Sequence, residues 1–397
     1  MNKQAGLSEV WIKASIIGSL WAASEIVLGS FLHNLKIPFS GNVLTAIAIV
    51  LLISISYFWT DKGLFWRAGL ICAILKTISP SAVIFGPMIA IISQAFLMET
   101  SVRVFGRTVF AFAIGGMLAM SWNFVQKILN FIIFYGYNIV EVYNNLVSYA
   151  QGQLNLDVEH TWIPILVLLG IYCCFGLFAS VIGIVAGRKI IGFKDSNNTA
   201  LNFKNNSMFF KKKDYDFNYS ITWLFANVVL IIAAMFILNY TSWVFWSIAI
   251  VCLVVLWTFR YKRAFKQLLR PRFWMFFVVI TMLAAVVFSR IQNADISEGL
   301  LIGIQMNFRA VVIILGFSVL GTELYNPRIR EFFLKSSYNQ FHLALELAFD
   351  SLPFMIANMP DVKSLMRKPI SVLYSFVTLA EKRLEKIRNN QDKKVFI

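Results

Sequence analysis

Long runs of apolar residues, separated by shorter polar segments, make up most of this chain of 397 residues. A helix needs about twenty mostly apolar residues to cross the hydrocarbon core of a bilayer. Ten runs approach that length, so the pattern predicts an all-α, polytopic membrane protein with about ten transmembrane helices. The ten runs are Ile12–Leu32, Gly41–Trp59, Gly63–Thr77, Ala82–Leu97, Arg107–Asn123, Trp162–Gly187, Ile221–Leu238, Trp243–Thr258, Phe273–Ser289 and Leu300–Leu320.

Two places along this pattern are less regular. The third and fourth runs are short and meet at Ser79-Pro80, which fits either a tight hairpin of two spans or a broken pair. The segment Val125–His160 is long for an outer connection and carries four tyrosines, with polar residues at helical spacing. It predicts either a lid over an extracytoplasmic pocket or a pair of interfacial helices anchored by those tyrosines.

The composition agrees with a membrane protein. Of all residues, 58% are hydrophobic and 14% are charged, whereas a soluble domain is about 25% charged. The net charge of +16 would suggest nucleic acid in a soluble protein. Here the basic residues gather at helix ends and in loops, so topology and anionic lipid explain the charge, and no nucleic acid partner is expected.

Basic residues also orient the spans, because loops rich in Lys and Arg stay in the cytoplasm. With the N-terminus inside, the basic segments Arg188–Ser220 and Phe259–Arg272 both fall on the cytoplasmic side, and the outer loops are poor in base. The pattern predicts a multi-pass protein of the cell inner (plasma) membrane, with an even number of spans and both termini cytoplasmic.

A polar linker rich in Asn and Lys divides the chain into two membrane domains. We expect a six-helix domain over 1–190, the basic cytoplasmic linker over 191–220, a four-helix domain over 221–322 and cytoplasmic helices over 323–397. Within this tail, Tyr338–Met359 has one broad apolar face, which would lie in a groove of another protein or along the inner leaflet.

The sequence lacks the motifs of soluble catalysis. It contains no Gly-x4-Gly-Lys-Ser/Thr, His-Glu-x-x-His, Gly-x-Ser-x-Gly or Cys-x-x-Cys. The four cysteines lie in apolar runs and the three histidines are widely separated, so neither a metal site nor a cofactor is expected. We expect the chain not to be catalytic itself. A lipid-modifying enzyme would need acidic or histidine residues clustered at one interface, and the sequence shows no such cluster.

Glu25 and Lys76 are opposite charges at similar depths in the outer half of their predicted spans. Charges inside a membrane either pair with each other or contact a polar substrate. Trp21, Trp122 and Asn123 reach the same depth, and together the five residues predict a charged, aromatic cup for a small polar molecule. The alternative is a structural ion pair with interfacial tryptophans.

Small residues recur every four positions along the first run, at Ala14, Gly18 and Ala22. Residues four apart share a helix face, and small ones let two helices approach closely in lipid. This face predicts docking of another membrane unit, or packing inside the six-helix domain.

Arg309 lies near the middle of the last run, close to Gln305 and Asn307. An arginine costs roughly 2.5–3.5 kcal/mol at the centre of a membrane helix on the insertion scale. The three polar groups must therefore face neighbouring helices or a partner. Alternatively, backbone carbonyls inside the four-helix domain satisfy the arginine.

Three segments of the second half carry a resemblance to a known family. Leu268–Trp274 is similar to a basic turn before a hydrophobic helix, Ser297–Arg309 to a segment that ends in an intramembrane arginine, and His342–Pro353 to the helix that follows. With the two preceding spans, they make this half resemble the transmembrane scaffold (T) component of energy-coupling factor importers. The family's Ala-Arg-Gly-like signatures are missing, and Ser364–Pro369 is their nearest analogue.

The first half, Trp11–Lys189, looks like a substrate-binding (S) component of the same importers. The resemblance implies a membrane subunit of an ATP-driven micronutrient (vitamin or precursor) importer, which fuses capture and scaffold units and relies on separate P-loop ATPase subunits. It also implies residues that couple to those ATPases, here Arg309, Arg328, Arg330 and Arg367. The alternative is an orphan membrane substrate-binding module or receptor without ATPase coupling.

Overall fold

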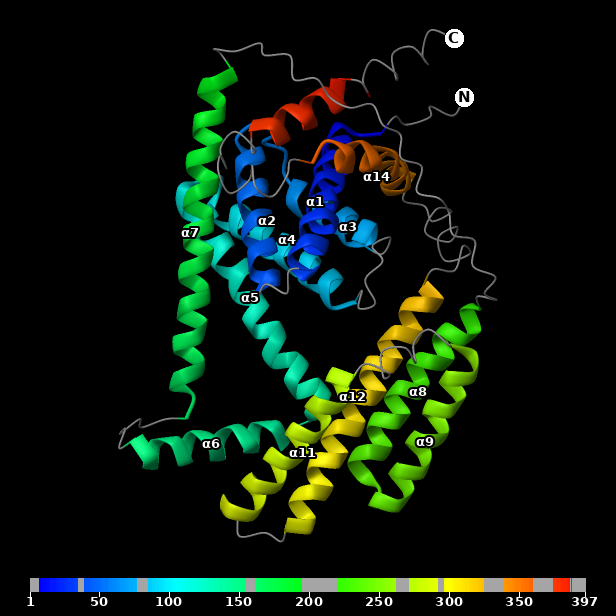
Figure 1. Ribbon diagram of the computed structural model, residues 1–397. Coiled ribbons are helices and arrows are strands. Elements are labelled where there is room, and N and C mark those ends of the chain that lie inside the picture. Colours follow the sequence, from blue (N-terminus) through cyan, green and yellow to red (C-terminus); the bar gives the residue numbers. More distant parts are fainter. Residues whose placement is uncertain are drawn as a thin grey trace. The chain divides into compact units, whose positions relative to one another are not determined.

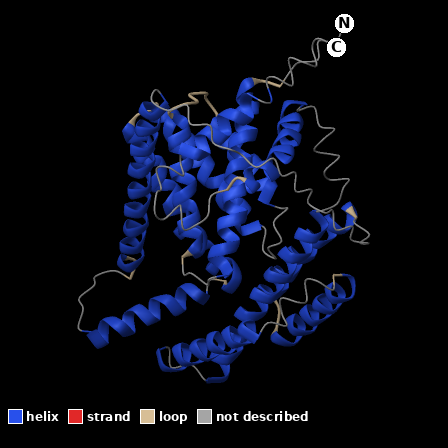
Figure 2. Ribbon diagram, turned by 45° about the horizontal axis from the view of Figure 1, so that its top comes forward, coloured by secondary structure: helices blue, strands red, loops and turns tan. Residues whose placement is uncertain are grey.

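Every regular element described in the computed structural model is a helix, as Figures 1 and 2 show. The predicted all-α class is therefore confirmed for the described part of the chain. The structure describes residues 7–34, 39–76, 85–136, 138–154, 161–194, 220–261, 271–291, 296–324, 339–359, 374–385 and 387.

The helices follow the apolar runs and end where the backbone turns. The bounds are α1 Glu9–Asn34, α2 Ser40–Ser56, α3 Leu64–Lys76, α4 Phe85–Phe105, α5 Val109–Tyr135, α6 Asn138–Leu154, α7 Ile163–Lys194, α8 Ile221–Tyr240, α9 Trp243–Arg260, α11 Pro271–Ile291, α12 Ile296–Leu324 and α14 Asn339–Ala357. Residues 374–385 are also helical. Gly106 after α4 and Gly136 after α5 have φ of +69° and +72°, a conformation that glycine adopts without a Cβ clash.

Seven helices in the described part of the chain are long and apolar enough to cross a membrane. They are Glu9–Leu32, Gly86–Phe105, Val109–Ile133, Ile163–Ile190, Ile221–Tyr240, Trp243–Arg260 and Ile296–Leu320. The chain is thus a multi-pass membrane protein by helix length and hydropathy, but the predicted count of ten spans was too high.

Helix ends explain the difference between ten and seven. α2 has 17 residues and α3 has 13, so both are short of the roughly twenty residues that a span needs. The predicted run Gly63–Thr77 was itself shorter than a span, and α3 covers Leu64–Lys76 of it. Ser79-Pro80 lies outside the described residues, and the predicted span Phe273–Ser289 falls on α11, whose side chains are described only in part.

The described residues group into two compact units that are not continuous in sequence. Unit 1 draws on Met1–Phe124, Leu168–Asp214 and Leu334–Ile397, and unit 2 on Val125–Val167 and Tyr215–Phe333. This grouping by contacts differs from the linear division expected above. The segment that contains α6 belongs to unit 2, and the C-terminal helices belong to unit 1.

Unit 1 is built around α1, which packs along α2, α3 and α14. Apolar residues lie on several faces of this helix, and 72% of its membrane-length window is buried. Neighbouring helices therefore cover most of its surface. α4 packs on α3, and α7 meets α2 where Ser54 Oγ donates to the carbonyl of Gly183 at 3.2 Å.

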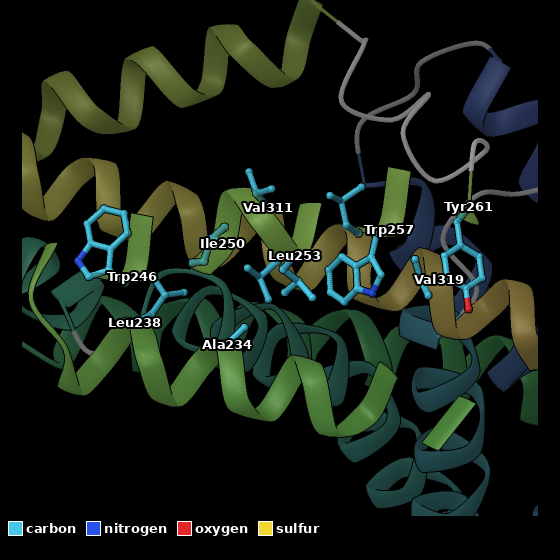
Figure 3. Packing of buried hydrophobic residues seen from close by; sticks show 11 residues of the cluster. Ala234, Leu238, Trp246, Ile250, Leu253, Trp257, Tyr261, Val311 and Val319 are labelled. Atoms are coloured by element: carbon cyan, nitrogen blue, oxygen red, sulfur yellow. The ribbon is translucent and has the colours of Figure 1, made fainter. Parts of the chain in front are cut away.

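Unit 2 has an apolar core between α8, α9 and α12 (Figure 3). Its members are Ala234, Leu238, Trp246, Ile250, Leu253, Trp257, Tyr261, Val311, Val312, Leu315 and Val319. α11 packs along α12, and α6 contacts α11. These neighbours enclose the middle of α12, where Arg309 lies.

Candidate functional site

The strongest concentration of polar groups inside unit 1 starts with an ion pair. The structure brings Glu25 of α1 and Lys76 of α3 together, with 3.2 Å between Nζ and Oε2. The ammonium group also donates to the backbone carbonyl of Glu25 at 3.0 Å. The two residues are 8% and 7% exposed, so each charge depends on the other inside the unit. The alternative of a structural ion pair therefore describes this geometry, whereas a role in substrate binding stays a prediction.

Trp21 lies one helical turn before Glu25 and is fully buried. Its ring packs near Gly69, where α3 crosses α4. The indole Nε1 has no hydrogen-bond partner among the described residues. A buried donor without a partner costs about 1–3 kcal/mol, so an acceptor atom of a bound molecule would be favourable here.

Sequence reasoning missed a second polar cluster, which joins α2, α4 and α5. The amide nitrogen of Gln94 donates to Thr45 Oγ1 at 3.0 Å and to Asn123 Oδ1 at 2.8 Å. Asn123 Nδ2 in turn donates to Thr45 Oγ1 at 2.8 Å. Gln94 and Thr45 are buried, and the signal that would have found them is a polar side chain inside a predicted span.

Trp122 precedes Asn123 on α5, and its indole Nε1 is a second buried donor without a partner in the described structure. The predicted cup residues thus fall into two groups, Glu25, Lys76 and Trp21 at α1–α3, and Asn123 in the amide cluster. Ile91 lies three positions before Gln94 and four before Ala95 on α4, so it neighbours both on the helix surface.

Ala95 and Ile91 of α4 lie next to Gly69 of α3, beside which the Trp21 ring also lies. Each of helices α1 to α5 contributes a polar group to unit 1, namely Glu25, Thr45, Lys76, Gln94 and Asn123. Among the described residues, no three His, Cys, Asp or Glu side chains gather closely enough to hold a metal ion.

Another polar cluster holds the opposite end of α3 from Lys76. Glu99 accepts hydrogen bonds from the backbone N–H groups of Gly63 at 2.7 Å and Phe65 at 3.2 Å. Arg107 donates to the carbonyl of Asp61 at 2.8 Å. Burial lowers the pKa of the Arg107 guanidinium from its usual value, and the Glu99 and Asp61 carboxylates act against that shift. These hydrogen bonds satisfy backbone groups at and just before the start of α3, and the sequence pattern did not predict them.

The small-residue face of α1 is buried. Ala14 and Ala22 are fully buried, and a Cβ on Gly18 would stand 2.7 Å from the Ile71 side chain and 2.9 Å from the Ala68 carbonyl of α3. At Gly18 the structure thus has the second of the two expected arrangements, packing inside the first domain. A role of this face in docking another unit stays untested.

Arg309 is buried in unit 2, where three polar residues of α12 contact neighbouring helices. Its Nη2 donates to Asn239 Oδ1 of α8, and its Nη1 to the carbonyl of Tyr135 at 3.4 Å. Asn307 donates to Thr281 Oγ1 of α11 at 2.8 Å, and Gln305 to a carbonyl of α8. The expectation that they face neighbouring helices is confirmed.

Comparison with known proteins found no matching family model, no matching curated protein and no matching solved structure.

Unit 2 also contains a fully buried carboxylate that sequence reasoning missed. Glu323, near the end of α12, accepts hydrogen bonds from Tyr261 OH at 2.6 Å and from the backbone N–H of Ser220 at 2.9 Å. Asn227 donates to Tyr261 OH at 2.9 Å, and Trp257 Nε1 donates to Asn227 at 3.1 Å. The network joins one end of each of α8, α9 and α12.

The predicted coupling residues Arg328, Arg330 and Arg367 lie outside the described residues. The neighbouring tail helix α14 packs on α1, with the rings of Phe341 and Trp11 5.6 Å apart. Arg383 pairs with Asp350 of α14 at 2.6 Å. The described tail helices are therefore part of unit 1.

Proposed function

We propose that this chain is the membrane subunit of an ATP-driven importer of the energy-coupling factor type. Unit 1 would capture a small polar micronutrient, such as a vitamin or precursor, and the helices of unit 2 would form the scaffold. Separate P-loop ATPases would supply the energy. Both termini would lie in the cytoplasm, which requires one further span besides the seven apolar helices described.

The polar interior of unit 1 is the observation that carries this proposal. A closed Glu25–Lys76 pair, the free indole donor of Trp21 and the cluster around Asn123 lie inside a membrane-embedded helical unit. Polar groups are costly at such a depth, and they usually mark a substrate or ion pathway. The buried Arg309 supports the scaffold part, since the resemblance expects an intramembrane arginine at this place.

A second candidate is a membrane substrate-binding module or receptor without ATPase coupling. One observation favours it: α14, which lies in the tail expected to contact ATPases, packs on α1 instead. The missing Ala-Arg-Gly-like signatures point the same way. Both candidates share the capture site in unit 1 and differ only in their protein partners.

The test is purification of the tagged chain from its native membranes in mild detergent, followed by mass spectrometry of proteins and small molecules that copurify. A stoichiometric P-loop ATPase supports the importer, and a chain that emerges alone with a small molecule supports the second candidate. Trp21→Phe removes the indole donor but keeps an aromatic ring, and it should reduce the bound small molecule. Retention of that molecule at the wild-type level would count against the capture site.

A further inference from the structure

The chain leaves unit 1 within α5 and returns to it within α7. The stretch between, Val125–Val167, comes from the first half of the sequence but belongs to unit 2 with the helices of the second half. It contains the end of α5 and the whole of α6. The described contacts thus tie the two halves of the sequence together inside unit 2.

At the corner between α5 and α6, the guanidinium of Arg309 lies directly on Gly136. Nη1 donates to the carbonyl of Tyr135, the last residue of α5, at 3.4 Å. A Cβ at Gly136 would overlap Nη1, so the arginine occupies the space that any side chain would need. Gly136 also has a φ of +72°, and its N–H donates to the Ile132 carbonyl at 2.7 Å, which ends α5 at this point.

The other side of the guanidinium is held by α8, through Asn239. Arg309 is 7% exposed, and its Nε has no partner in the described part of the chain. A buried guanidinium has few alternative partners, so losing the Tyr135 carbonyl would leave it still less satisfied. The cost of its burial therefore favours keeping the α5–α6 corner against α12.

We propose that Arg309 is a positioning residue that joins the α5–α6 corner to α8 and α12, and that this joint links the two halves of the sequence. The Arg309 side chain holds this corner by lying against the backbone of Gly136, which has no side chain of its own. α6 then moves with α12. In the importer, a point that rests on the proposed function, this joint would pass movement of the scaffold helices to the capture half.

Hydrogen exchange of the full-length protein in detergent, followed by mass spectrometry, tests the joint without measuring transport. Arg309→Gln should speed exchange in peptides from the end of α5 and from α6 by about tenfold or more, because local opening becomes easier. Arg309→Lys should have a smaller effect, since an ammonium can still reach one acceptor. Peptides of α1 and α3 should not change.

Gly136→Ala tests the same joint without removing the charge. Gly106→Ala is its matched control, because Gly106 has nearly the same φ of +69° but has nothing within 4 Å of the added Cβ. Gly136→Ala should speed hydrogen exchange in peptides from α6, whereas Gly106→Ala should speed exchange only in peptides around position 106. In the Arg309→Gln background, Gly136→Ala should add no more than this control does.

If neither Arg309→Gln nor Gly136→Ala changes hydrogen exchange in α6, the proposed joint is wrong. The same holds if the effects of the two substitutions on exchange in α6 add fully in the double variant. If Arg309→Gln does not give folded protein, Gly136→Ala against Gly106→Ala decides alone. A failed ATPase copurification leaves this result untouched, so failure of the joint and failure of the proposed function remain distinguishable.

Discussion

At the scale of single residues, the polar side chains inside the predicted spans find partners on neighbouring helices. Lys76 has Glu25, Arg309 has Asn239 and Tyr135, and Asn307 has Thr281. Lipid offers no such partners, so each polar group has to be satisfied within the protein. The two indole donors without partners, in Trp21 and Trp122, stand out against this pattern and are the natural places to look for a ligand.

Removing one member of the buried ion pair should be costly. Lys76→Met leaves the Glu25 carboxylate buried without its partner, and we expect a loss of about 3–5 kcal/mol in the free energy of unfolding. Thermal unfolding in detergent would measure it. The double variant with Glu25→Gln should be more stable than Lys76→Met alone, and equal or lower stability would show that the pair is not coupled.

Gly18→Ala should destabilise unit 1 by about 1–3 kcal/mol, because the new Cβ would press on Ile71 and on the Ala68 carbonyl. Gly41→Ala is the control, since nothing lies within 4 Å of its added Cβ and it should change stability little. A loss of function in Gly18→Ala with wild-type melting would instead support the predicted docking role of this face.

At the scale of elements, buried carboxylates hold the helix ends. Glu99 accepts from the N–H groups at the start of α3, and Glu323 accepts from the N–H at the start of α8. The first N–H groups of a helix have no partner in the helix itself, and a carboxylate there also meets the positive end of the helix dipole. Each of these carboxylates lies on a different helix from the one whose start it binds, so helix capping and tertiary packing are the same interaction here.

The hydroxyl of Tyr261 makes the Glu323 network dependent on pH. Burial and the hydrogen bond to Glu323 raise its pKa from the usual 10 to about 12. The folded state therefore keeps a proton that the unfolded state loses between pH 10 and 12. The stabilisation is complete below pH 10 and is lost as the pH rises toward 12.

Tyr261→Phe should cost about 1.5–3 kcal/mol at neutral pH, because the Glu323 carboxylate loses a donor. It should also make melting less sensitive to pH between 10 and 12 than in the wild type. Melting curves at pH 8, 10 and 11.5 would check both points. Equal pH sensitivity in the two proteins would mean that Tyr261 does not carry the effect.

At the scale of the whole molecule, sequence order and spatial grouping differ. Unit 1 takes its helices from both ends of the chain, and unit 2 takes α6 from the first half. The tail was expected to serve external partners, yet α14 covers α1 with an apolar face that includes the fully buried Ala344 and Ala348. The C-terminal helices therefore contribute to the stability of the unit that holds the candidate capture site.

A charge on the buried face of α14 should loosen unit 1. Ala348→Glu would bury an unpaired carboxylate, and we expect a loss of at least about 2 kcal/mol, with faster hydrogen exchange in α1. Leu343→Glu, on the same helix but 38% exposed, should change little. If the two variants behave alike, α14 does not pack on α1 in the membrane-extracted protein.

The sequence by itself determined the helical class and the multi-pass membrane character, and it singled out Glu25 and Lys76 as opposite charges in spans that could pair. Apolar run length and charge placement are local properties, and they fix these features. The same reasoning overcounted the spans, because it counted the apolar runs of α2 and α3, whose helices have only 17 and 13 residues.

Only the tertiary structure decided which groups face each other. The partners of Arg309 come from α8 and from the end of α5, 70 and 174 positions away in the sequence. Thr45, Gln94 and Asn123 are likewise brought together by packing of three helices. A single sequence does not show which of these distant residues are in contact, because that depends on how the side chains of different helices pack together.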